Sequence, residues 1–286
     1  MAVGRRAHPN PPKELATMKF PYATILLSLL ALSVTTEVLW MGNISRPPTT
    51  IYHMWHAALM LFVITVRLAY QKQLSPQVAR YARILIAGMA MCALGDVVNS
   101  AISGIEPISQ KLSIAIILFG AGYSLYVYVL YRFSQPRLAL RHGIGYRMRW
   151  SVVMIVAVAN TVGWVSYVRA PVAGHRFLEL GSFLFNLVIY TLMISFSIWY
   201  FWANRLSLPA LPVLIGGLLL PLSDLYLFST WLAPGQDRNV PVFDLYAANW
   251  ILYFGGQVLF AFLPACENDA RLSESPRSGN RPAELG

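Results

Sequence analysis

The chain has 286 residues, of which 57% are hydrophobic and 12% are charged. Soluble domains carry about 25% charged residues, so this composition argues against a soluble globular protein. The formal net charge is +10, but the basic residues gather at the ends of long apolar stretches, where they face lipid headgroups, so we predict no nucleic-acid partner.

Eight apolar stretches follow one another along the chain, and each is long enough to cross roughly 30 Å of hydrocarbon. The predicted spans are 20–41, 51–66, 84–102, 112–131, 150–168, 177–202, 208–231 and 242–263, of which the second is the shortest. The short connections leave no room for a soluble domain. We therefore predict one all-α domain at 20–263, a polytopic membrane helix bundle, with disordered tails at 1–19 and 264–286.

The basic residues are distributed unequally between the predicted loops. Both tails and every second loop hold most of them, and the loop after the fourth span is the richest. Its arginines and those at its edges are Arg132, Arg137, Arg141, Arg147 and Arg149. Because basic residues mark the cytoplasmic side, we predict that both termini are cytoplasmic. The membrane would be the endoplasmic reticulum in a eukaryote and the inner membrane in a bacterium.

Two aspartates lie inside predicted spans, where a charged side chain costs at least ~2.5–3.5 kcal/mol at the helix centre. Asp96 is in the third span and Asp224 is in the seventh. Both spans are predicted to run outward from the cytoplasm, and a rise of ~1.5 Å per residue places the two carboxyls at similar depth. In one site they would share a proton, because two like charges in low dielectric cannot both ionise. We predict a catalytic pair in which the protonated carboxyl is a general acid.

Polar side chains in neighbouring spans are the candidates for substrate binding. In the last span Asn249, Tyr253 and Gln257 stand four residues apart and form one stripe on a helical face. Such a stripe faces protein or water rather than lipid, and hydrogen bonding between helices is the alternative interpretation. The complete set of predicted substrate-binding residues is Tyr123, Tyr126, Asn99, Asn249, Tyr253 and Gln257.

The remaining polar residues of the spans suggest no cofactor. His53 and His56 stand three residues apart, a spacing that two metal ligands on one helix can use, but no third ligand has a matching position, so we predict no metal. Glu37, Glu179 and Asp244 lie near span ends, where side chains reach water at little cost. Gly-rich phosphate loops and the motifs of serine and zinc hydrolases are absent from the sequence.

Three segments, at 93–98, 216–224 and 253–257, carry a family likeness. They place a Gly-Asp in the third span, a Ser-Asp in the seventh and a Tyr-x-x-x-Gln in the last. In order and position they resemble the YhhN-type lysoplasmalogenase family, over roughly residues 50–263. The resemblance implies an eight-span enzyme that hydrolyses the vinyl ether of lysoplasmalogens and releases a fatty aldehyde. It also implies that Asp96 and Asp224 are the catalytic pair.

The chain departs from that family in two places, which leaves alternatives open. Tyr123 stands where the family usually has a histidine, and a lysine near the second span is missing. A membrane-bound terpene cyclase, acting on a prenylated small molecule, also begins by protonating an epoxide or alkene, but it excludes water. A proton-coupled transporter or lipid-binding protein is the third alternative, although transporters often show repeated halves. We place hydrolysis of an amphipathic lipid in the bilayer first.

Overall fold

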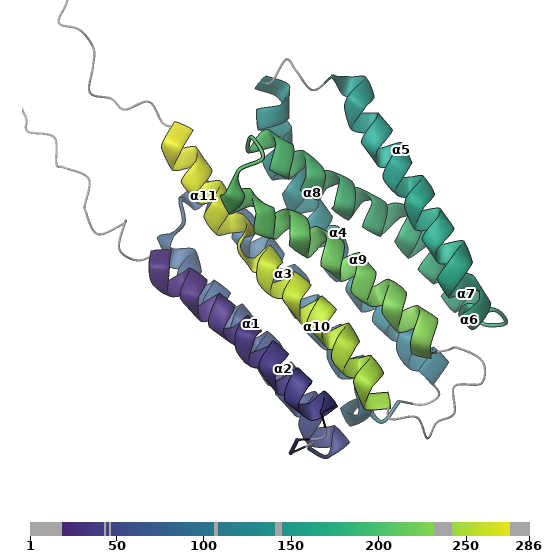
Figure 1. The fold of residues 1–286 in the computed structure, drawn as a ribbon. Coiled ribbons are helices and arrows are strands. Elements are labelled where there is room, and N and C mark those ends of the chain that lie inside the picture. The colour runs from purple at the N-terminus through teal and green to yellow at the C-terminus, as the bar shows by residue number, and fades with distance from the viewer. Residues whose placement is uncertain are drawn as a thin grey trace, which may run out of the picture.

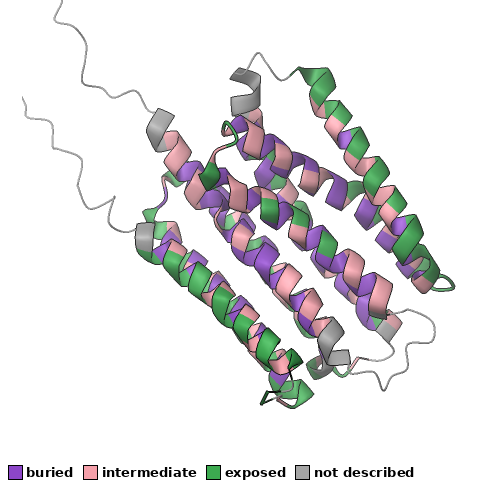
Figure 2. Cartoon of the chain, in the orientation of Figure 1, coloured by how far each residue is buried: buried purple, intermediate pink, exposed green. Residues whose placement is uncertain are grey.

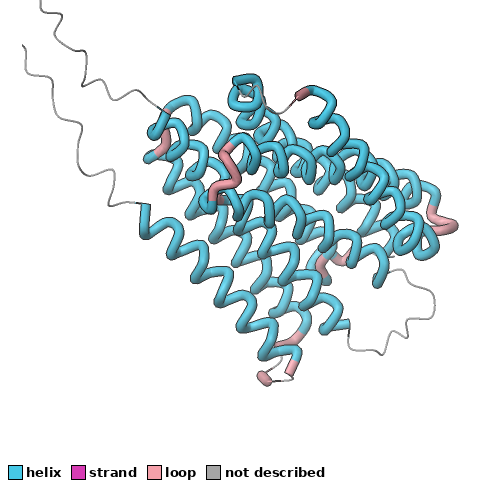
Figure 3. Tube along the Cα trace, turned by 45° about the horizontal axis from the view of Figure 1, so that its top comes forward, coloured by secondary structure: helices cyan, strands magenta, loops and turns pink. Residues whose placement is uncertain are grey.

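The computed structural model describes residues 19–42, 44–45, 47–105, 108–140, 145–231 and 242–274. Within these ranges the chain is helical and contains no strand (Figure 1; Figure 3). Eight of its helical stretches are long and apolar enough to cross a membrane. The prediction of an all-α, multi-pass membrane bundle is therefore confirmed. Much of the predicted tails, at 1–18 and 275–286, lies outside the described residues.

The first five spans follow one another in chain order. The helices are α1 (Lys19–Met41), α2 (Thr49–Tyr70), α3 (Pro76–Asn99), α4 (Ile108–Leu140) and α5 (Tyr146–Gly163). A π-helical segment, η4 (Trp164–Val168), joins α5 to the short α6 (Arg169–Val172). Short 3₁₀ turns follow α2 and α3.

The last three spans include a second π-helical segment. The helices are α7 (Arg176–Leu184), η5 (Phe185–Tyr190), α8 (Thr191–Ala203), α9 (Leu211–Trp231), α10 (Val242–Ala261) and α11 (Leu263–Glu274). Figure 1 places the start of α1 and the end of α11 at the same end of the bundle, as an even number of spans requires. That both termini are cytoplasmic remains a prediction.

Two span boundaries differ from those expected. The second span is not the shortest, since it runs over Thr49–Gln73. Arg67 does not end it, because this side chain is fully buried and its Nη1 donates to Tyr22 Oη on α1 at 2.9 Å. The third span begins at Pro76 rather than at residue 84. Arg80 and Arg83 lie within this helix, and their side chains are exposed on its outer face.

The disordered tail expected from residue 264 is wrong for its first part. Residues Leu263–Glu274 form α11, which packs against α3. Asn268 Oδ1 accepts a hydrogen bond from the Ser75 amide at 3.0 Å, and Glu267 is buried and bonded to Arg271 at 2.6 Å. Contacts to a distant part of the chain, which local composition does not report, order this segment.

Small residues bring the central helices together. A Cβ atom on Gly88 of α3 would lie 2.8 Å from the Gly122 carbonyl oxygen of α4. On the other side of the centre, a Cβ on Gly216 of α9 would lie 3.0 Å from the Gly256 carbonyl oxygen of α10. Such contacts let helix backbones approach closely in a membrane. The helix that carries Asp96 and the helix that carries Asp224 are thereby each packed tightly against a partner.

The outside of the bundle is apolar. Figure 2 shows that α1 and α5 are largely exposed, whereas burial is concentrated in the helices between them. Large hydrophobic side chains such as Ile155 on α5 and Leu27 on α1 point outward. In water these faces would be unfavourable, but in a bilayer they meet lipid tails. Asp96 of α3, Asp224 of α9 and Gln257 of α10, in contrast, lie inside the bundle.

Candidate functional site

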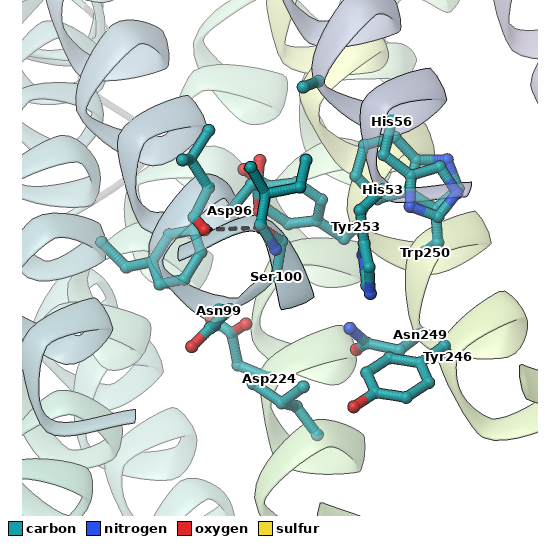
Figure 4. A pocket seen from close by; sticks show the side chains of 15 residues that line it. His53, His56, Asp96, Asn99, Ser100, Asp224, Tyr246, Asn249, Trp250 and Tyr253 are labelled. Carbon is teal, nitrogen blue, oxygen red and sulfur yellow. Dashed lines mark hydrogen bonds between the residues drawn. The ribbon is translucent and has the colours of Figure 1, made fainter. Parts of the chain in front are cut away.

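A pocket of about 60 Å³ lies among α2, α3, α9 and α10, with Phe119 of α4 at its wall. Asp96 and Asp224 both line it, so the fold brings the two predicted aspartates to one site (Figure 4). Its other polar lining residues include His53, His56, Asn99, Asn249 and Tyr253. The pocket has room for several water molecules, since one needs about 10–15 Å³ of such space.

Each aspartate is held by a tyrosine hydroxyl. Tyr253 Oη donates to Asp96 Oδ2 at 2.8 Å, and Tyr190 Oη donates to Asp224 Oδ2 at 2.6 Å. Asp224 is 5% exposed, whereas Asp96 is only half-buried at the pocket wall. The Tyr123 hydroxyl of α4 also lies close to the Asp224 carboxyl. One oxygen of each carboxyl is thus fixed by a tyrosine hydroxyl.

Tyr190 was not predicted from the sequence. It ends the π-helical segment η5, and π-helical turns inside α-helices are frequent at functional sites. Around it, Asn160 Nδ2 of α5 donates to Thr191 Oγ1 at 3.1 Å and Asn186 Nδ2 donates to the Ser182 carbonyl at 2.8 Å. Tyr190 lies in a different span from Asp224, so no spacing along the chain pairs the two residues, and the sequence offers no signal for this contact.

The six predicted substrate-binding residues divide into two groups. Asn99, Asn249 and Tyr253 line the pocket, and the Oδ1 atoms of Asn99 and Asn249 are buried without a hydrogen-bond partner in the described part of the chain. Buried acceptors are normally satisfied, so these two indicate a place for water or a bound hydroxyl.

The other three lie deeper in the bundle and do not line this pocket. Tyr126 Oη donates to Gln257 Oε1 at 2.6 Å, which joins α4 to α10 as the helix–helix alternative expected. Tyr123 packs in a ring cluster with Phe119 and Tyr190, at centroid distances of 6.0 and 6.3 Å. These side chains support the wall behind the aspartates.

Glu37 does not reach water, so that expectation was wrong. It is fully buried, accepts from Tyr52 Oη at 2.9 Å, and lies 2.7 Å from His56 Nε2. The reason is that α1 and α2 pack along each other and turn this carboxylate toward α2 rather than toward the membrane surface. The described residues contain no group of three His, Cys, Asp or Glu side chains placed to bind a metal ion.

A second cavity, of about 260 Å³, lies on the far side of Tyr190. It is bordered by α5, α8 and α9, and its walls include Gly163, Leu218 and Leu222. A narrow space of about 10 Å³ is lined by both Tyr190 and Asp224. Tyr190 therefore stands between the aspartate pocket and a larger, mostly apolar space beside the outermost helix.

The chain matches the YhhN family over residues 51–263. No curated protein and no solved structure matches it. The matched region contains Asp96, Asp224 and both tyrosines that hold them, and it agrees with the likeness of the three sequence segments. Since it covers most of the chain, the protein belongs to the YhhN family.

Proposed function

We propose that this protein is an intramembrane hydrolase that cleaves the vinyl ether of a lysoplasmalogen by acid catalysis. The observation that carries the proposal is the meeting of Asp96 and Asp224 in one pocket inside an apolar bundle. Two acidic side chains inside a membrane bundle are energetically costly, which indicates a functional role. Membership of the YhhN family supports a hydrolase.

The proposed chemistry begins with one aspartate protonated. It transfers its proton to the vinyl carbon remote from the ether oxygen, and the double bond becomes an oxocarbenium ion. The other aspartate, as a carboxylate, stabilises that positive charge across the pocket. Water then adds to the carbon that bears the oxygen, and the hemiacetal collapses to a fatty aldehyde and a glycerophospho-alcohol.

The surroundings of the two carboxyls suit a lysolipid. The unpartnered oxygens of Asn99 and Asn249 can accept hydrogen bonds from a glycerol hydroxyl. The apolar space beyond Tyr190 can take the aliphatic chain. In this arrangement the vinyl ether lies between a polar side near α10 and an apolar side near α5.

The direct test incubates the protein in lipid nanodiscs with a lysoplasmalogen and follows both products by mass spectrometry. We expect release of a fatty aldehyde, and no reaction of the matched saturated ether, which has no double bond to protonate. An epoxidised prenyl substrate is run beside it, and an isomeric product would favour the cyclase. If neither substrate reacts, the enzyme proposal is wrong, and proton-gradient-driven uptake becomes the next measurement.

Removing the tyrosine hydroxyls should slow the reaction without abolishing it. Tyr253→Phe and Tyr190→Phe each delete one hydrogen bond to a carboxyl oxygen. Hydrogen bonds to charged groups are worth about 1.5–3 kcal/mol, so we expect kcat to fall about 10-fold to 100-fold. Tyr167→Phe, on the exposed outer face, is the matched control and should keep full activity. Unchanged kcat in both pocket variants would contradict the proposed role of these hydroxyls.

A further inference from the structure

A second acid–base pair reaches the aspartate pocket, from α1 and α2. Glu37 of α1 is fully buried, and its two carboxylate oxygens contact Tyr52 Oη and His56 Nε2. Removing a carboxylate from water costs several kcal/mol, and partners in the bundle interior repay that cost only when their geometry is excellent. Stability alone therefore gives no good reason for placing these groups inside a membrane bundle.

The His56 ring is held from two sides. It stacks on Trp250 with 3.8 Å between ring centroids and an interplanar angle of 7°. Trp250 is itself anchored to α1, because its Nε1 donates to Ser33 Oγ at 3.0 Å. Rotation of the imidazole is thus opposed by the stack and by the Glu37 contact. Because the His56 ring is held in this way, the nitrogen that does not contact Glu37 keeps a fixed direction.

The ring nitrogen that does not contact Glu37 is Nδ1. An ionised Glu37 accepts a hydrogen bond from Nε2–H of His56, so Nδ1 carries the lone pair. Among the described residues Nδ1 has no hydrogen-bond partner, and His56 lines the same pocket as Asp96 (Figure 4). A neutral imidazole oriented by a carboxylate is the arrangement in which histidine serves as a general base.

We propose that His56 activates the water that captures the oxocarbenium ion, and that Glu37 and Tyr52 are the residues that position it. This inference rests on the proposed hydrolysis. Glu37 precedes the residues that match the family, so family membership assigns it no role. In this proposal the aspartate pair creates the cation, and His56, which lines the same pocket and is positioned by Glu37, activates the nucleophile.

The steps balance as follows for the vinyl ether. The protonated aspartate gives its proton to the remote vinyl carbon. Water oxygen bonds to the carbon that bears the ether oxygen, while Nδ1 of His56 takes a water proton. In the collapse His56 returns that proton to the departing ether oxygen as the C–O bond breaks. The hemiacetal hydroxyl gives its proton to the aspartate as the C=O bond forms, so both groups return to their starting states.

Deuterium incorporation separates this role from a structural one. In D₂O, a His56→Gln variant still forms the cation but captures it slowly. The cation then loses a proton from the remote carbon, and the recovered vinyl ether keeps a deuterium there. We expect aldehyde release to fall about 100-fold while deuterium accumulates in unreacted substrate. The wild type should show aldehyde carrying one deuterium and little exchange, and His175→Gln, in an exposed turn, should behave like the wild type.

Each outcome has a distinct meaning. If His56→Gln keeps full aldehyde release, or loses it without substrate exchange, His56 is not the water-activating base. Glu37→Gln is the second variant, and an intermediate loss with some exchange is expected of a positioning residue. Because exchange needs a folded site with a working acid, a positive signal also excludes misfolding. Failure of the hydrolysis itself would appear instead as no aldehyde from the wild type.

Discussion

Asp96→Asn and Asp224→Asn are each expected to lower the turnover of a lysoplasmalogen about 1000-fold, within the range that general acid catalysis contributes. Asparagine keeps the shape of the side chain and its contact with the tyrosine, but it can neither supply the proton nor stabilise a cation by charge. Both carboxyls line one pocket, and in the proposed hydrolysis they act on the same reaction. The double variant should therefore lose little beyond either single variant, because residues that act as a unit are not additive.

The matched control for the aspartate variants is Glu179→Gln. Glu179 is a carboxyl on α7 that does not line the pocket, so its conversion to an amide should leave turnover unchanged. Initial rates of aldehyde release in nanodiscs, at equal amounts of folded protein, give the comparison. Full turnover in either aspartate variant would refute the catalytic pair.

Gly88→Ala is expected to lower the free energy of unfolding by about 1–3 kcal/mol, the usual cost of overpacking a core. The added methyl would lie 2.6 Å from Tyr126 Cε1 and 2.8 Å from the Gly122 carbonyl oxygen. The Tyr126 side chain cannot move aside, because its ring is stacked on Phe260 and its hydroxyl donates a hydrogen bond to Gln257. The contact between α3 and α4 would have to open, which displaces the helix that carries Asp96.

Gly163→Ala provides the control for that effect. It also places a methyl on a helical glycine, but the nearest atom is 4.0 Å away. Alanine in a helix is favoured over glycine by roughly 0.5–1 kcal/mol, so this variant should be as stable as the wild type or more so. Thermal unfolding in detergent micelles compares the two. Equal unfolding midpoints for Gly88→Ala and Gly163→Ala would contradict close packing at Gly88.

Much of the architecture was predictable because hydrocarbon imposes simple rules. A spanning helix needs about 20 apolar residues, and that requirement can be read directly from composition. The same rules failed where a charged side chain was buried by another helix. The predicted second span ends at residue 66, whereas α2 continues through Arg67, which is buried against Tyr22. The ordered α11 depends on contacts with α3.

The eight spans and the candidacy of Asp96 and Asp224 follow from the amino-acid sequence alone, because an acidic residue far inside an apolar stretch is costly wherever its neighbours lie. The groups that surround those aspartates follow from the packing of the helices. Tyr190 reaches Asp224 from a π-helical segment, and Glu37 meets His56 across two helices. Such contacts depend on helix rotation and on side-chain packing between distant segments. Spacing along one chain records the faces of a single helix but not the partner that each face meets.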